Sequence, residues 1–131
     1  MFNRSLFSSE DHDTRTPKGF FEKLDQEFNF TLDVCPNHSL IDMLALSWYG
    51  RVYCNPPYNN QKPFIVKALE EIDKKHVELA VFLIPSRTDT KLFHEIIMPR
   101  ATDIRFIKGR LKFEGQKNSA PFPSMIVVFK S

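Results

Sequence analysis

The chain has 131 residues, of which 42% are hydrophobic and 26% are charged, with a formal net charge of +2 at pH 7. This length and composition fit one globular domain with a single core. No apolar run approaches the roughly 20 residues of a membrane-spanning helix, and residues 1–15 lack the apolar centre of a signal peptide. We therefore expect a cytoplasmic protein without a membrane partner.

Charge is unevenly distributed along the chain. Residues 1–98 carry 11 Lys and Arg against 14 Asp and Glu, a net charge of −3, whereas residues 99–131 carry 7 against 2, a net charge of +5. A polyanion would bind this basic last third, although a solvated basic face that serves solubility would show the same bias. The 2 cysteines and 4 scattered histidines have no metal-ligand spacing, so we expect no metal.

The first part of the chain predicts an arm, a helix and a strand. Residues 1–15 are polar and without periodicity, which predicts a mobile N-terminal arm ahead of a domain over 16–131. Phenylalanines at helical spacing after an early proline predict a helix over 17–28. The alternating residues 30–35 predict the first strand, which Pro36 ends because proline cannot donate to a sheet.

The middle of the chain continues this alternation. Residues 52–54 predict a short strand, and the amphipathic pattern of residues 63–72 predicts a helix. Residues 77–85 are almost continuously apolar, which is typical of a strand buried on both faces.

The last third completes the fold class. A helix is predicted after residue 85, capped by Thr88 or Asp89 and ended by Pro99. Residues 104–107 and 125–129 predict two further strands. Strands that alternate with helices indicate an α/β fold with a mostly parallel central sheet flanked by helices.

The most informative residues follow the predicted strand 52–54, where an α/β sheet places ligands. In Asn55-Pro56-Pro57-Tyr58, the two prolines fix φ at about −65° and hold Asn55 out of the α region. The Asn55 side-chain oxygen and the Pro56 carbonyl can each accept one hydrogen of an exocyclic amine, and the Tyr58 ring can stack on a base. The segment is typical of a site for a planar amine, although the same residues also make ordinary strand-ending turns.

With this turn in place, the chain resembles the phage-type DNA N6-adenine methyltransferase (Dam-like) family over about residues 14–130. Five blocks carry the resemblance in order. They are Thr16-Pro17 with the phenylalanine-rich helix after it, residues 30–35, residues 53–58, residues 84–90 with Phe93-His94, and residues 104–113 with 120–124.

The resemblance implies an abbreviated Rossmann-like fold that depends on S-adenosylmethionine. It implies double-stranded DNA as the partner and an adenine flipped out of the duplex, on which Tyr58 would stack. The implied catalytic residues are Asn55, Pro56, Pro57 and Tyr58. Methyl transfer from a sulfonium needs orientation rather than a covalent intermediate, so we expect no Ser or Cys nucleophile.

The resemblance also implies where S-adenosylmethionine would bind, with Asp33 or Asp42 accepting hydrogen bonds from it. The implied cofactor-binding residues are Thr16, Pro17, Asp33, Val34, Cys35, Asp42 and Asn55.

Candidate substrate-binding residues lie in three places. Each place also has a structural explanation: Thr88 or Asp89 could be an ordinary helix cap, and Arg110 and Lys112 could be solvated residues of a strand. The candidates are Tyr58, Arg87, Asp89, Thr90, Arg110 and Lys112.

The expected activity is site-specific or low-specificity methylation of adenine N6 in DNA. Two alternatives stay open: a catalytically silent nucleic-acid-binding remnant, because the segment 37–42 is short for a cofactor wall, and an enzyme that methylates amino groups of RNA or protein. A dimer would enlarge the DNA footprint. If the chain is phage-encoded, it would act in the cytoplasm of a bacterial host.

Overall fold

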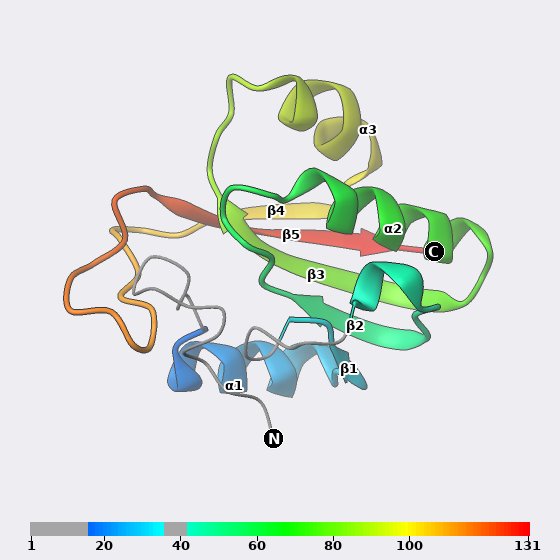
Figure 1. Ribbon diagram of the computed structural model, residues 1–131, viewed down its shortest axis with the longest axis horizontal. Helices are drawn as coiled ribbons and strands as arrows, with labels where there is room; N and C mark the ends of the chain where they lie inside the picture. The colour runs from blue at the N-terminus through cyan, green and yellow to red at the C-terminus, as the bar shows by residue number, and fades with distance from the viewer. Residues whose placement is uncertain (1–15, 36–41) are drawn as a thin grey trace.

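A five-stranded sheet with helices on both faces forms the body of the protein (Figure 1). The computed structural model describes residues 16–35 and 42–131, so the predicted arm over 1–15 lies outside the described residues. The strands lie in the order β1 (Leu32–Asp33), β2 (Gly50–Cys54), β3 (Val77–Pro85), β5 (Ser124–Lys130) and β4 (Asp103–Phe106).

The strand directions bring most carboxyl ends to one edge of the sheet. β1 pairs in parallel with β2, and β2 with β3, whereas β5 runs antiparallel to both β3 and β4. Four of these five strands therefore share one direction, and the expected mostly parallel α/β fold is confirmed. β3 is the central apolar strand that the sequence predicts, with Ala80 and Phe82 fully buried.

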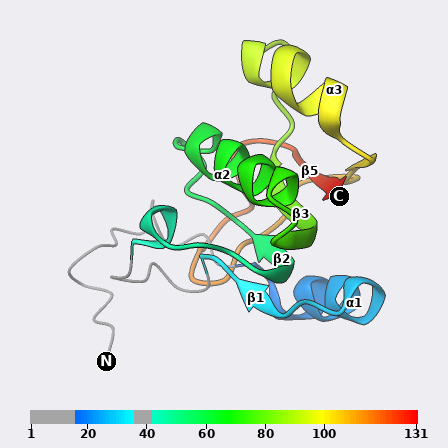
Figure 2. The same cartoon turned by 90° about the vertical axis from the view of Figure 1, so that its right-hand side faces the viewer.

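Helices cover the two faces separately, as Figure 2 shows from the side. α1 (Lys18–Phe28) packs Leu24 and Phe28 on one face, and α2 (Lys62–Asp73) packs Ile65 and Ala68 on the other. Both helices lie within one residue of their predicted bounds, because apolar residues at helical spacing give each a single buried stripe.

The helix after β3 differs from the prediction at both ends. Its cap is Thr90, whose Oγ1 accepts a hydrogen bond from the Phe93 N–H at 3.2 Å, so the expected cap at Thr88 or Asp89 is wrong. The chain then forms the π-helical turn η4 (Leu92–Ile97) and α3 (Met98–Arg100), and Pro99 does not end the helix.

The π-helical turn explains how the helix passes through Pro99. The Met98 N–H bonds to the Phe93 carbonyl, five residues back, rather than to the carbonyl four residues back. This wider turn relieves the clash of a proline ring with the preceding turn, and proline has no N–H that would need a partner.

The first strand is shorter than predicted. Only Leu32 and Asp33 form β1, although the Thr31 N–H donates to the Arg51 carbonyl at 2.7 Å and the Val34 N–H donates to the Tyr53 carbonyl at 2.9 Å. The short 3₁₀ helix η3 (Met43–Ala45) precedes β2. Within the described ranges, no helix is long and apolar enough to cross a membrane.

Candidate active site

The predicted site segments meet at the carboxyl edge of the sheet. Residues 33–35 follow β1, residues 55–58 follow β2 and residues 86–90 follow β3. Thr16 reaches the same edge ahead of α1, and the loop 107–123 between β4 and β5 projects beside it (Figure 1). The parallel arrangement of β1, β2 and β3 is what places these separate segments together.

Two hydrogen bonds join Thr16 to β2 and to the turn that follows it. The Thr16 Oγ1 lies 2.6 Å from the Tyr53 hydroxyl oxygen, and the Asn55 Nδ2 donates to the same Thr16 Oγ1 at 3.2 Å. Tyr53 is 1% exposed, and burial raises the pKa of its phenol. Thr16 thus contacts the turn over residues 55–58 directly, in addition to its predicted place near the cofactor.

Asp33 presents an unpaired buried oxygen at the end of β1. Burial raises the pKa of the Asp33 carboxyl to about 6, against the backbone hydrogen bond from Cys35, which lowers it. Its Oδ1 is buried and has no hydrogen-bond partner within the part of the chain that the structure describes. Buried polar atoms are nearly always hydrogen-bonded, so this oxygen marks a place where a ligand can donate.

The other predicted cofactor residues have different surroundings. The Val34 side chain is buried in the core, so only its backbone is available to a ligand. Asp42 accepts a hydrogen bond from the Leu44 N–H at 3.1 Å and caps η3. Cys54 is fully buried beside Cys35, and burial raises the pKa of the Cys54 thiol, which fits a packed side chain rather than a nucleophile.

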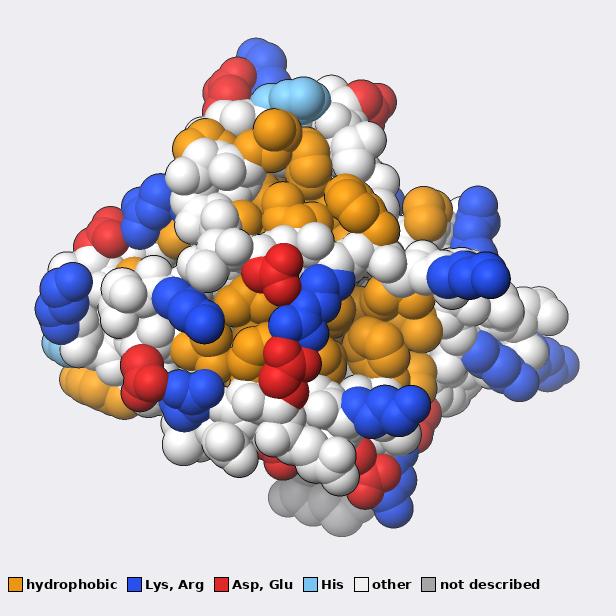
Figure 3. All heavy atoms as spheres, turned by 180° about the vertical axis from the view of Figure 1, so that it is seen from behind, with side chains coloured by type: hydrophobic (Ala, Val, Ile, Leu, Met, Phe, Trp, Pro, Cys, Tyr) orange, Lys and Arg blue, Asp and Glu red, His pale blue; other side chains and the backbone are white. Residues whose placement is uncertain are grey.

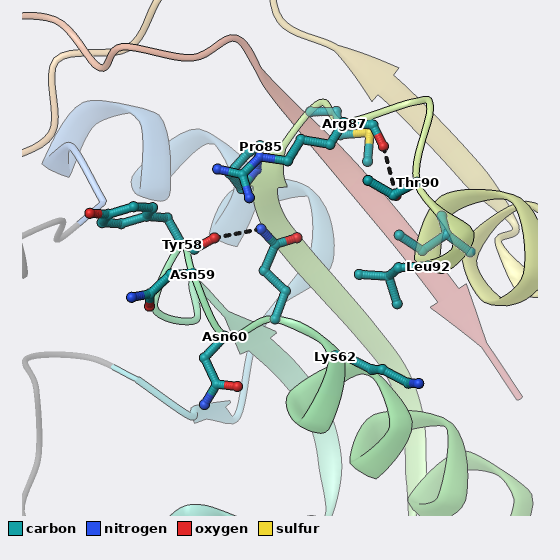
Figure 4. Close-up of a pocket in the computed structure, with 11 residues that line it drawn as sticks. Tyr58, Asn59, Asn60, Lys62, Pro85, Arg87, Thr90 and Leu92 are labelled. Carbon is teal, nitrogen blue, oxygen red and sulfur yellow. Dashed lines mark hydrogen bonds between the residues drawn. The ribbon is translucent and has the colours of Figure 1, made fainter.

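A pocket of about 220 Å³ adjoins the turn over residues 55–58 (Figure 4). The turn over residues 58–62 lines one side, and Arg87, Thr90 and Leu92 line the other. The Gln61 Nε2 donates to the Tyr58 carbonyl at 2.7 Å, which ties the turn to the start of α2. The structure therefore brings Tyr58, Arg87 and Thr90 together, whereas Asp89 is exposed and does not line this pocket.

An aromatic residue from the loop 107–123 stands beside Tyr58. The ring of Phe122 lies 5.8 Å from that of Tyr58, and Phe113 lies 6.2 Å behind Phe122. Sequence reasoning did not name Phe122 or Tyr53 as site residues. Each lies inside a block that carries the family resemblance, which was the available signal.

Ion pairs divide six of the seven basic residues of the last third into two groups. Arg100 binds Asp73 at 2.7 Å, and Arg105 binds Glu27 at 2.7 Å and Asp103 at 2.8 Å. The second group consists of exposed residues in the loop 107–123 that have no ion pair within the described ranges. They are Lys108, Arg110, Lys112 and Lys117.

Figure 3 shows basic side chains gathered on the side where this loop projects. The residues that line the pocket beside Tyr58 do not include Arg110 or Lys112, which are exposed in the loop 107–123.

Comparison with solved structures supports the fold class. A structure from Pyrococcus horikoshii, described as a candidate RNA methyltransferase, superposes with a TM-score of 0.50 at 14% identity, covering 67% of this chain and 46% of that one. At this identity the likeness shows the fold alone. The chain has a methyltransferase-type α/β fold.

Sequence comparison then gives the family. The family model described as DNA N-6-adenine-methyltransferase (Dam) matches residues 4–131. The DNA N-6-adenine-methyltransferase of Haemophilus phage HP1 is 30% identical over 152 residues, covering 99% of this chain and 86% of the phage protein. The chain belongs to the DNA N-6-adenine-methyltransferase (Dam) family, which confirms the resemblance described above.

Proposed function

We propose that the protein transfers a methyl group from S-adenosylmethionine to the exocyclic amine of a flipped adenine in double-stranded DNA. The observation that carries the proposal is the Asn55-Pro56-Pro57-Tyr58 turn at the carboxyl end of β2, with the Asn55 amide held by Thr16. Family membership supplies the substrate class.

The residues beside this turn fit the cofactor. The unpaired buried oxygen of Asp33 would accept a hydrogen bond from a donor group of S-adenosylmethionine. Thr16, Pro17, Cys35, Asp42 and the backbone of Val34 would border it. When bound, the cofactor supplies an activated methyl group on a sulfonium.

The turn itself would hold the adenine. The Asn55 side-chain oxygen and the Pro56 carbonyl would each accept one hydrogen of the amine, which keeps its lone pair directed at the methyl group. Tyr58 would stack on the flipped base, with Phe122 close beside it. Arg87 and Thr90, in the adjoining pocket, would contact the DNA strand next to this adenine.

No covalent intermediate with the protein is needed. Fixed orientation in a dry site can supply roughly 7–11 kcal/mol of the barrier reduction. The chain's contribution is therefore to position the amine and to exclude water.

The loop 107–123 would bind the DNA backbone. Arg110, Lys112 and their neighbours are exposed and not engaged in ion pairs within residues 16–35 and 42–131, so their charges are available to phosphates. For a phage-family protein that acts on DNA, the place of action would be the cytoplasm of a bacterial host.

Methyl transfer can be tested directly. We expect the protein, incubated with methyl-labelled S-adenosylmethionine and duplex DNA, to form N6-methyladenine that mass spectrometry of the nucleosides detects. Asn55→Ala should abolish the product while the circular dichroism spectrum stays unchanged. Asn29→Gly, at the left-handed C-cap of α1 and away from the turn, is the matched control and should retain activity.

Two further measurements separate the alternatives. DNA binding without calorimetric binding of S-adenosylhomocysteine would identify a catalytically silent remnant that has lost the cofactor wall. RNA and protein substrates in the same assay would show whether the amine belongs to another class of molecule. Absence of both cofactor binding and product would refute the proposal.

A further inference from the structure

Two segments that are far apart in sequence meet at one hydroxyl group. Thr16 lies ahead of α1, Tyr53 lies within β2, and Asn55 lies in the catalytic turn. The Tyr53 hydroxyl and the Asn55 Nδ2 both bond to the Thr16 Oγ1, at 2.6 and 3.2 Å. The Tyr53 hydroxyl therefore helps to position the Thr16 Oγ1, and the Thr16 Oγ1 in turn helps to orient the Asn55 side chain.

Tyr53 is held rigidly enough to act as the fixed end of this chain. Its ring is 1% exposed and contacts Phe21 edge-on at 5.0 Å and Phe30 at 5.2 Å between ring centroids. A buried hydroxyl without a partner is costly, so the phenol keeps its bond to Thr16. Burial raises the pKa of this phenol still further above neutral pH.

The structure directs the Asn55 Nδ2 toward the Thr16 Oγ1, which can only accept there when its own hydrogen is donated to the Tyr53 oxygen. The nitrogen and oxygen of an amide lie on opposite sides of the same carbon, so directing Nδ2 at Thr16 directs Oδ1 away from it. An amide turned over by 180° would present N–H groups to the N–H groups of an amine substrate. Only one of the two orientations therefore supports the proposed reaction.

We propose that Thr16 and Tyr53 are positioning residues that hold the Asn55 amide with its oxygen toward the substrate amine. This inference rests on the proposed function and deepens it. The two residues act through Asn55, and neither needs to touch the adenine.

Kinetic comparison of single variants tests the role. Tyr53→Phe keeps the ring and removes the hydroxyl, and Thr16→Val keeps the shape and removes the hydroxyl. Loss of one hydrogen bond should lower kcat by about 3- to 10-fold in each variant, with the KM for DNA changed less than about twofold. In Tyr53→Phe, which does not border the proposed cofactor site, the KM for S-adenosylmethionine should also change less than about twofold. Thr16→Ser, which restores the hydroxyl, should recover most of the rate.

The double variant and a matched control complete the kinetic design. Thr16 and Tyr53 act through the same series of hydrogen bonds. The double variant Thr16→Val/Tyr53→Phe should therefore lose little more activity than Thr16→Val alone. Tyr49→Phe is the control: Tyr49 is exposed and stacks on His76, away from the site, so kcat should stay at the wild-type value.

A measurement without catalysis separates this inference from the proposed function. The side-chain NH₂ signals of Asn55 in an NMR spectrum are identified by their loss in Asn55→Ala. Tyr53→Phe should shift these signals and speed their exchange with water, and Tyr49→Phe should not.

Several outcomes would overturn the positioning role. They are unchanged Asn55 signals in Tyr53→Phe, a wild-type kcat in that variant, or a Thr16→Val variant whose only change is a raised KM for the cofactor. A wild-type protein that transfers no methyl group would refute the proposed function, and the NMR comparison would then decide the positioning role alone.

Discussion

The rings of Tyr58 and Phe122 lie 5.8 Å apart between centroids, with their planes inclined by 30°. This tilted pair joins the turn after β2 to the loop 107–123, although more than sixty residues separate Tyr58 from Phe122 in the sequence. Two aromatic faces that approach in this way form a platform for a planar base.

Removing Phe122 should weaken methylation. Stacking of a base on an aromatic ring contributes about 1–3 kcal/mol, so Phe122→Ala should lower kcat/KM for DNA by about 5- to 100-fold, whereas Phe122→Tyr should retain most activity. Steady-state kinetics measure the effect. The control is Phe106→Ala, because Phe106 is 63% exposed on β4 and outside the site. Equal losses in both alanine variants would contradict a stacking role.

Cofactor binding should depend on pH through Asp33. Its folded pKa of about 6 lies above the ordinary value of 3.8, because burial disfavours the charged form. If the ionised carboxylate accepts a hydrogen bond from the cofactor, binding of S-adenosylhomocysteine should strengthen as the pH rises from 5 to 7 and then level off. Calorimetry across this range measures the effect, and Asp33→Asn should give a flat profile.

The same pKa has the opposite consequence for stability without ligand. Protonated Asp33 favours the folded state below its unfolded pKa of about 3.9, and this contribution is lost as the pH rises through about 6. The difference in unfolding free energy between wild type and Asp33→Asn should therefore change over the pH range from 4 to 6. A difference that stays constant over this range would argue against a raised pKa.

Glu71 should make the fold sensitive to acid. Its carboxylate is fully buried and accepts hydrogen bonds from the Trp48 N–H at 3.0 Å and from the His76 Nδ1 at 3.1 Å. Burial alone would raise the pKa of Glu71, but these hydrogen bonds, with Lys67 and Lys74 nearby, hold it below its usual value. Its stabilising effect is therefore present above the unfolded pKa and is lost as the pH falls through the lower folded pKa.

Replacement of Glu71 should show this directly. Glu71→Gln should lower the unfolding free energy at pH 7 by about 1–3 kcal/mol, since bonds to a charged acceptor are lost. Denaturant unfolding measures the change, which should shrink at acid pH. Glu70→Gln, at the exposed neighbouring position, should be nearly neutral. A pH-independent loss in Glu71→Gln would show that its charge is not the cause.

The basic loop should determine the salt dependence of DNA binding. Each phosphate contact contributes about 0.9 to the slope of log K against log salt concentration. Replacing Arg110 and Lys112 together by alanine should therefore reduce the slope by about 1.8. Arg100→Ala is the control, because Arg100 pairs with Asp73. DNA titrations at several salt concentrations measure the slope of log K against log salt concentration. A slope that falls only in the control variant would contradict the prediction.

The helices and strands that could be predicted are those determined by residues adjacent in the sequence. The apolar run of β3 and the helical spacing of α1 and α2 are properties of adjacent residues, and all three lie within one residue of the predicted bounds. The Asn55–Tyr58 turn is local as well, because its two prolines restrict the backbone wherever they occur.

The features that could not be predicted depend on residues far apart. Thr90 caps the helix because the turn after β3 places its hydroxyl there, although Thr88 and Asp89 are equally suitable residue types. Likewise, Arg105 is neutralised by Glu27, 78 residues earlier, so its charge in the sequence did not show whether it was available to DNA.

The sequence by itself therefore determined the fold class, the family resemblance and the turn that would hold an amine. Only the tertiary structure placed the reversed β5 between β3 and β4, brought Phe122 beside Tyr58 and joined Thr16 to Tyr53 and Asn55. The physical reason is that propensity and backbone restriction act between neighbours in the chain, whereas strand pairing and side-chain contacts depend on how the whole chain packs.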